Sequence, residues 1–314
     1  MTGDPEPEDG TPITFTEPIS EPFARAAAKV LKDLRELATD AFPDETGGPD
    51  SPFRREAAAF DALPEPTREA RRSMHAMILN LVPLSWSNAL DHVRALEQDV
   101  LMQPPPVWSP LTLSRAVMEN CLFLHYLIDP EISGEKRLAR CAGLWRTDVE
   151  HMEKTARAFG PAQVAAVAKT KDYVLTALRD VGALERTNAQ GRLIGYEVDG
   201  EKSGLDINLT EEAKAMPSHL PAPYRILSGA AHGRPWMTGR AQELAQDSDD
   251  DLRGEVATVM TAVVVAAGAL ETALKAWRDY FGLDLGDTLE HLNGLYRMFF
   301  IEAVNLGVES ARQL

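Results

Sequence analysis

A long apolar stretch without a charged residue runs from Val256 to Leu270, between Glu255 and Glu271. It is shorter than the roughly 18 to 20 apolar residues that a helix needs to cross a bilayer. A segment of this kind is typical of a helix at the centre of a globular core, and we expect that helix to span 252 to 281. With 314 residues, of which 44% are hydrophobic, the chain can build a substantial core around it.

Apolar residues recur at helical spacing along most of the chain, which predicts an all-α multi-helix bundle. A first helix is expected to begin near Pro22. Prolines separate the next patterns, because proline usually ends or kinks a helix. The further helices are expected near 53–62, 66–82, 86–102, 111–128, 133–159, 161–185, 221–232, 252–281 and 287–308.

One segment departs from the helical period. Around 190–209, Tyr196 and Val198 precede an Asp199-Gly200 pair, and such a pair is typical of a two-residue hairpin turn. We therefore expect one small β-hairpin inserted into the bundle. No internal repeat of fixed period is present.

The prolines also suggest how the chain is divided. Residues 1–20 are acidic and rich in proline, which predicts a flexible arm. A helical region over 21–103 follows, and the Pro104 to Pro106 run is a stiff connector into the main bundle over 104–314. We expect 21–103 and 104–314 to pack together as one domain.

Charge and cysteine content limit the possible partners and compartments. The chain is acidic, with a formal net charge of −16, so its average field repels nucleic acid and anionic lipid. Its two cysteines, Cys121 and Cys141, lie in apolar helical patterns, and we expect them to be free thiols. No secretion signal or membrane-spanning segment is seen, so we expect a cytoplasmic protein that does not bind membranes.

The first candidate site lies on the helix predicted over 111–128, which is apolar almost all round. Arg115 and Glu119 stand one turn apart on it, and Tyr126 continues the same stripe. Buried charges must be paired and hydrogen-bonded, because burying an ion costs several kcal/mol. The pair is therefore either a structural brace or the floor of a polar pocket that binds a substrate.

The second candidate site is the segment from Tyr224 to Gly233, with Ser228 between the two charged residues. Arg225 and His232 are seven residues apart, which places them on one helix face. Arginine can stabilise the charge of a phosphorane-like transition state while histidine moves a proton. The alternative is that His232 lies at a helix end and makes its hydrogen bonds with the backbone.

This segment resembles the HEPN superfamily of helical bundles, whose ribonuclease members carry an arginine, four to six residues and then a histidine. The resemblance covers about 109–281. It implies Arg225 and His232 as catalytic residues, RNA as substrate, no metal, and a site built between two protomers of a homodimer. The same arginine-to-histidine spacing also occurs at Arg68 with His75 and at Arg146 with His151.

A metal site is the alternative reading of two carboxylate and imidazole pairs, Asp148 with His151 and Asp287 with His291. Such pairs on facing helices resemble those of helical di-iron oxidases, which implies iron as cofactor and Glu119 as a further ligand. Asp287 is an equally good helix N-cap. The aspartates between 247 and 251 are open to two readings as well, magnesium binding or favouring the start of the next helix.

Three classes of function follow from these patterns. The first is a HEPN-like protein directed at RNA, which requires His232 to face an open cleft. The second is an enzyme or binder of a small molecule, with a pocket near Arg115, Glu119 and Tyr126. The third is a noncatalytic interaction module, in which the helix over 252–281 is partly committed to a subunit contact.

Overall fold

The computed structural model describes residues 21–41, 47–102, 106, 108–217, 223–232 and 252–312. In the last of these segments the side chains are described from 258 to 299 and at 301. The predicted arm over 1–20 and the aspartates between 247 and 251 lie outside the described residues.

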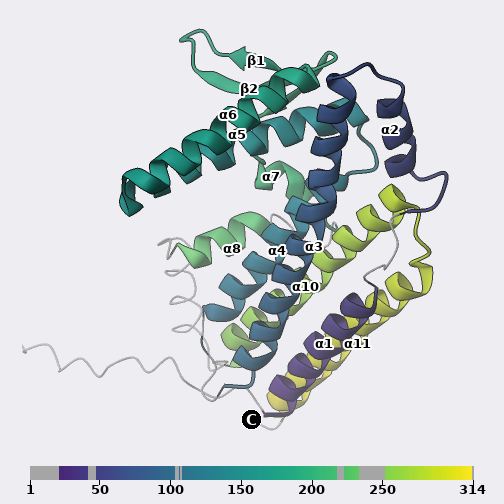
Figure 1. The fold of residues 1–314 in the computed structure, drawn as a ribbon. Helices are drawn as coiled ribbons and strands as arrows, with labels where there is room; N and C mark the ends of the chain where they lie inside the picture. Colours follow the sequence, from purple (N-terminus) through teal and green to yellow (C-terminus); the bar gives the residue numbers. More distant parts are fainter. Residues whose placement is uncertain are drawn as a thin grey trace, which may run out of the picture.

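Within these ranges the protein is a helical bundle that carries one small antiparallel sheet, which confirms the predicted fold class (Figure 1). The helices are α1 (Glu21–Asp40), α2 (Pro52–Asp61), α3 (Thr67–Asp99), α4 (Ser109–Ile128), α5 (Gly134–Phe159), α6 (Pro161–Val181), α7 (Leu209–Glu212), α8 (Pro223–Ala231), α10 (Leu252–Phe281) and α11 (Gly286–Arg312). The strands are β1 (Leu184–Thr187), β2 (Leu193–Val198) and β3 (Glu201–Gly204).

The apolar helix α10 lies at the centre of the bundle, as the sequence predicted. It packs along α4, which in turn packs along α3, while α1 and α11 cover its other side (Figure 1). One part of it, Thr258–Phe281, is long and apolar enough to cross a membrane, but 83% of its most apolar window is buried inside the protein. This burial leaves little of the segment Thr258–Phe281 for a contact with another subunit.

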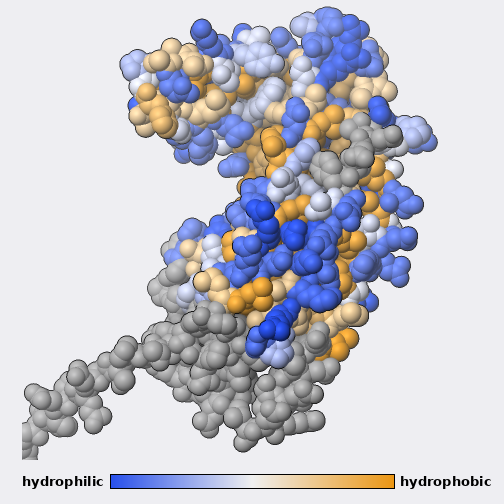
Figure 2. Space-filling view, turned by 60° about the horizontal axis from the view of Figure 1, so that its bottom comes forward, coloured by the Kyte–Doolittle hydropathy of each residue, from blue (hydrophilic) through white to orange (hydrophobic). Residues whose placement is uncertain are grey.

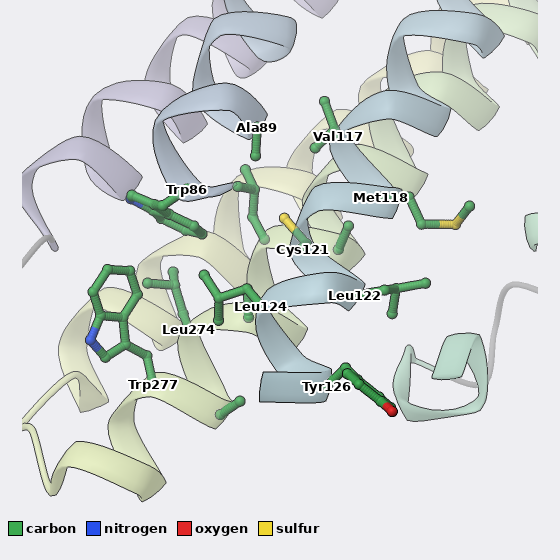
Figure 3. Packing of buried hydrophobic residues seen from close by; sticks show 14 of the residues in the cluster. Trp86, Ala89, Val117, Met118, Cys121, Leu122, Leu124, Tyr126, Leu274 and Trp277 are labelled. Carbon is green, nitrogen blue, oxygen red and sulfur yellow. The ribbon is translucent and has the colours of Figure 1, made fainter. Parts of the chain in front are cut away.

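Aromatic and sulfur-containing side chains fill the space between helices α3, α4 and α10 (Figure 3). Trp86 of α3 meets Trp277 of α10 edge to face, with ring centroids 5.5 Å apart. Cys121 and Leu124 of α4 are fully buried beside them. The continuous core includes residues from Phe23 to Phe299, so helices of the 21–103 region and of the 104–314 region share it.

Helix α3 corrects the prediction of two separate helices, 66–82 and 86–102. It continues through Pro83, which lies in its interior. Proline removes one helical hydrogen bond, but Val82 and Trp86 on either side of it are buried in the core. Tertiary packing therefore holds together a helix that the local sequence alone would interrupt.

The sheet is larger than the predicted hairpin, because a third strand, β1, pairs antiparallel with β2. The Asp199-Gly200 turn between β2 and β3 is confirmed: both residues have positive φ, 47° and 90°, as a type I′ turn requires. Strand β1 was missed because α6 was expected to continue to 185. The helix ends instead at Val181, where Gly182 adopts a left-handed C-cap.

The sheet packs on α5, and α5 with α6 forms a helical hairpin that projects from the bundle above α8 in the view of Figure 1. The surface is hollowed between this projecting part and the lower part of the bundle (Figure 2). The sheet is tied to α3 as well: Arg71 donates to Asp199 at 2.7 Å and to the carbonyl of Val181 at 3.2 Å. The turn that the sequence predicts is thus anchored to a distant helix.

Candidate functional site

The Arg115 and Glu119 pair forms as predicted on α4. The Nε of Arg115 donates to Oε1 of Glu119 at 2.7 Å, and the two side chains are 16% and 34% exposed. Helix α4 is sandwiched between α3 and α10, and it also contacts α8. The pair is therefore neither sealed in the core nor open on the surface.

His232 follows the last residue of α8 and is exposed. Its Nε2 lies 3.2 Å from Nη1 of Arg115, a contact between residues that are 117 positions apart in the chain. A guanidinium group can only donate hydrogen bonds, so Nε2 must accept. A hydrogen bond at this contact therefore requires the tautomer of the ring that carries its proton on Nδ1.

Tyr224, at the start of α8, completes the group. The guanidinium carbon of Arg115 lies 5.5 Å from the centroid of the Tyr224 ring, within cation–π range. We call Arg115, Glu119, Tyr224 and His232 the Arg115 cluster. The structure thus joins the two candidate sites that the sequence analysis found on separate helices.

Other predicted members of the site lie elsewhere. Arg225 is exposed on α8, and within the described residues the ring of His232 is hydrogen-bonded to Arg115 rather than to Arg225. Ser228 is half-buried, and its carbonyl accepts from the backbone N–H of His232 at 3.1 Å, as helical geometry requires.

Tyr126 does not belong to the Arg115 cluster. It lies about three turns further along α4, roughly 16 Å at the helical rise per residue. Its hydroxyl is 3.0 Å from Oγ of Ser203 on β3, and Arg140 stacks on its ring at 4.3 Å. The side chain is buried, and burial raises its pKa above the ordinary value. Tyr126 therefore joins α4 to the sheet.

The residues considered as iron ligands are not brought together. Asp148 and His151 are exposed on α5, whereas Asp287 and His291 are exposed on α11. Among the described residues, which include all of these and Glu119, no group of three or more His, Cys, Asp or Glu side chains is arranged to hold a metal ion. The geometry gives no support to the di-iron alternative.

The other two arginine-to-histidine spacings have different roles. Arg68 pairs with Glu65 on the surface. Arg146 forms an ion pair with Glu150 at 3.1 Å, and His151 is exposed. Neither spacing brings its arginine and histidine together in a hydrogen bond among the described residues.

His75, the histidine of the first of these spacings, belongs to a buried polar network that sequence reasoning missed. Its Nε2 is 3.0 Å from the hydroxyl of Tyr280, which donates to Glu56 at 2.9 Å. Arg137, only 1% exposed, donates to the same carboxylate at 3.2 Å. We call Glu56, His75, Arg137 and Tyr280 the Glu56 network.

The Glu56 network joins four helices, α2, α3, α5 and α10. Arg137 also donates to the backbone carbonyls of Leu127 at 2.7 Å and Asp129 at 2.9 Å, which lie at the end of α4. Burial alone would raise the pKa of Glu56, but the hydrogen bonds from His75, Arg137 and Tyr280 and the charge of Arg137 hold it below the ordinary value. No spacing in the sequence signals this network, because Glu56 and Tyr280 are 224 residues apart.

The buried position of the Glu56 network indicates a structural brace, since His75 and Tyr280 are both almost completely enclosed. The Arg115 cluster differs, because it combines a partly enclosed ion pair with an exposed imidazole whose Nε2 contacts the arginine. Such a group can take up a proton and can offer a cation to an anionic ligand. It is the candidate functional site.

Comparison of the chain with protein-family models, with curated proteins and with solved structures finds no match.

Proposed function

We propose that this protein is a HEPN-like helical protein that cleaves RNA without a metal ion, with the Arg115 cluster as its reactive site. The observation that supports the proposal most is the 3.2 Å contact between Arg115 and Nε2 of His232. It brings a permanent cation and a neutral proton acceptor to one place. Metal-independent cleavage of a phosphodiester needs both groups.

The reaction would be an internal transfer within the RNA chain. The 2′-hydroxyl oxygen attacks the adjacent phosphorus, and Nε2 of His232 takes the hydroxyl proton. The bond from phosphorus to the 5′-oxygen breaks, that oxygen takes a proton from a water molecule, and the hydroxide that remains takes the proton from His232. The products are a 2′,3′-cyclic phosphate and a free 5′-hydroxyl end.

Arg115 and Glu119 would have separate roles in this step. The guanidinium of Arg115 stabilises the negative charge that builds up on the phosphate oxygens in the transition state. Glu119 holds the guanidinium in place through the 2.7 Å hydrogen bond to Nε. Arg225, exposed in the first turn of α8, is available to contact a neighbouring phosphate.

The charge of the molecule limits how RNA would be bound. With a net charge of −16, the average field opposes a polyanion, so binding must rely on local cations such as Arg115 and Arg225. The proposal includes a cytoplasmic location and a homodimer in which a second protomer adds to the RNA contact. The free, buried cysteines Cys121 and Cys141 fit a reducing compartment.

The direct test is cleavage of a mixed RNA pool by the purified protein in EDTA. We expect the wild type to cleave and His232→Ala to lose at least about 100-fold in rate, the usual contribution of a general base. His291→Ala is the matched control, because His291 is an exposed histidine outside the cluster. Equal rates for His232→Ala and the wild type would rule out this mechanism.

A small-molecule enzyme or binder is the second candidate, and the enclosure of Arg115 favours it. The side chain of Arg115 is only 16% exposed, so a ligand that reaches it must fit beside Glu119 and Tyr224. The same RNA experiment separates the two candidates. A wild-type protein that cleaves no RNA in the pool would favour the small-molecule ligand.

A further inference from the structure

In this structure the proton acceptor of the Arg115 cluster, Nε2 of His232, already accepts a hydrogen bond. The lone pair on Nε2 of His232 accepts a hydrogen bond from Nη1 of Arg115 at 3.2 Å. The same lone pair must be empty before it can take a proton from a substrate. The arrangement is therefore a resting form, in which the cation blocks the base.

We propose that a ligand bearing a phosphate group converts this resting form into the reactive form by taking Arg115 away from His232. Phosphate oxygens accept the Nη1 hydrogen bond in place of Nε2, and the imidazole becomes free to act as a base. This inference rests on the proposed function for its choice of site. It adds that binding of the anion itself unblocks the base.

Hydrogen-bond strength explains why an anion can make this exchange. A guanidinium bond to a charged oxygen is roughly twice as strong as a bond to a neutral acceptor such as an imidazole nitrogen. Phosphate also fits the planar fork of arginine, which can present two parallel N–H groups. A neutral ligand offers no such advantage, so it would leave Arg115 on His232.

The surroundings of Arg115 allow this change of partner with little movement. Glu119 is bound to Nε, not to Nη1, so its 2.7 Å hydrogen bond can persist while Nη1 changes acceptor. The Tyr224 ring lies 5.5 Å from the guanidinium carbon and supports one side of the group. His232 follows the end of α8 and is exposed, so its ring can turn away from the arginine.

The experiment is a titration of the full-length protein, labelled with ¹⁵N in its histidines, with inorganic phosphate at fixed pH and ionic strength. The resonances of His232 are assigned from their loss in His232→Gln. We expect a saturable shift of the Nε2 resonance toward that of an imidazole nitrogen without a hydrogen bond, while the Nδ1 proton stays in place. A shift toward the imidazolium position, or no saturable shift, would overturn the inference.

Three variants make the assignment to Arg115 specific. Arg115→Gln should abolish the phosphate response, whereas Arg297→Gln, which removes an exposed arginine on α11 outside the Arg115 cluster, should keep it. Glu119→Gln leaves the guanidinium in place but removes a competing anion, so half-saturation should need less phosphate. A response of Arg115→Gln equal to that of the wild type would contradict the proposal even if Glu119→Gln failed to fold.

The outcome can be separated from that of the RNA experiment. A phosphate-dependent release of His232 in a protein that does not cleave RNA would support the release and exclude the ribonuclease. Cleavage by a protein whose His232 resonance does not respond to phosphate would retain the ribonuclease and exclude the release.

Discussion

At the scale of single residues, two arginines differ in their burial and in their hydrogen-bond partners. Arg137 is 1% exposed, and Glu56 and two backbone carbonyls accept its hydrogen bonds. Arg115 is also held by a carboxylate, but it donates a second hydrogen bond to the exposed ring of His232. Arg137 is buried with its hydrogen bonds made inside the protein, so it acts as a structural brace. Arg115 contacts an exposed group, so a ligand can reach it.

We predict that Glu56→Gln lowers the free energy of unfolding by about 3 kcal/mol, because it leaves the buried charge of Arg137 without a counter-ion. Urea unfolding at neutral pH measures the change. Glu36→Gln, an exposed glutamate on α1 that pairs with Lys32, is the matched control and should change stability by less than about 0.5 kcal/mol. A small effect of Glu56→Gln would mean that the amide satisfies the network equally well.

Glu56 also makes the stability of the protein depend on pH, and the direction follows from its lowered pKa. The pKa of Glu56 is lowered in the folded protein, so its stabilising effect is present above the ordinary glutamate value of about 4.3 and is lost as the pH falls through the folded-state pKa. The wild type should therefore lose more stability than Glu56→Gln between about pH 5 and pH 3.

At the scale of elements, the approach of α5 to the sheet depends on one glycine. A Cβ atom built on Gly143 would lie 2.2 Å from the carbonyl oxygen of Gly204 on β3. No side chain fits there, because the nearest atom belongs to backbone and cannot rotate away. The sheet is therefore held on α5 by close backbone packing, while the contact of Tyr126 with Ser203 joins it to α4.

Gly143→Ala should therefore destabilise the protein by about 3 kcal/mol, the upper part of the usual range for overpacking. In an unconstrained helix the same change stabilises, and Gly294→Ala on α11 provides that control, since a Cβ there meets nothing within 4 Å. We expect Gly294→Ala to gain up to about 1 kcal/mol. Thermal unfolding of both variants would show shifts of opposite sign. Shifts of the same sign would mean that α5 moves away from the sheet at little cost.

At the scale of the whole molecule, a net charge of −16 opposes the compact state, because like charges repel one another on folding. Charged and polar residues cover much of the face seen in Figure 2, with apolar residues exposed between them. Several ion pairs between exposed side chains, such as Arg94 with Asp91, offset part of the repulsion.

We predict that sodium chloride stabilises the protein, because it screens repulsion among the excess acidic groups. Raising the salt concentration from about 10 mM to about 200 mM should increase Tm by about 1 to 2 °C, which corresponds to roughly 1 kcal/mol for a chain of this size. Differential scanning calorimetry provides the measurement. A fall in Tm would show that attractive ion pairs dominate over the net repulsion.

The sequence alone determined the helical class, the central position of α10, the Asp199-Gly200 turn and the Arg115 and Glu119 pair. These features depend on neighbours within a few positions: the helical repeat of apolar residues, the φ angles that a turn requires, or two side chains one turn apart. Local rules failed at Pro83 and at β1, where tertiary packing and strand pairing decided the outcome.

Only the tertiary structure decided which polar residues meet. His232 contacts Arg115 across 117 positions, and Glu56 contacts Tyr280 across 224. Arg225, which the arginine-to-histidine spacing selected, lies exposed on α8, while Arg115 holds the histidine. A spacing along the chain fixes which residues share a helix face, but the partner of that face depends on how α8 packs on α4. That packing follows from burial of apolar surface by the whole molecule, which no short motif encodes.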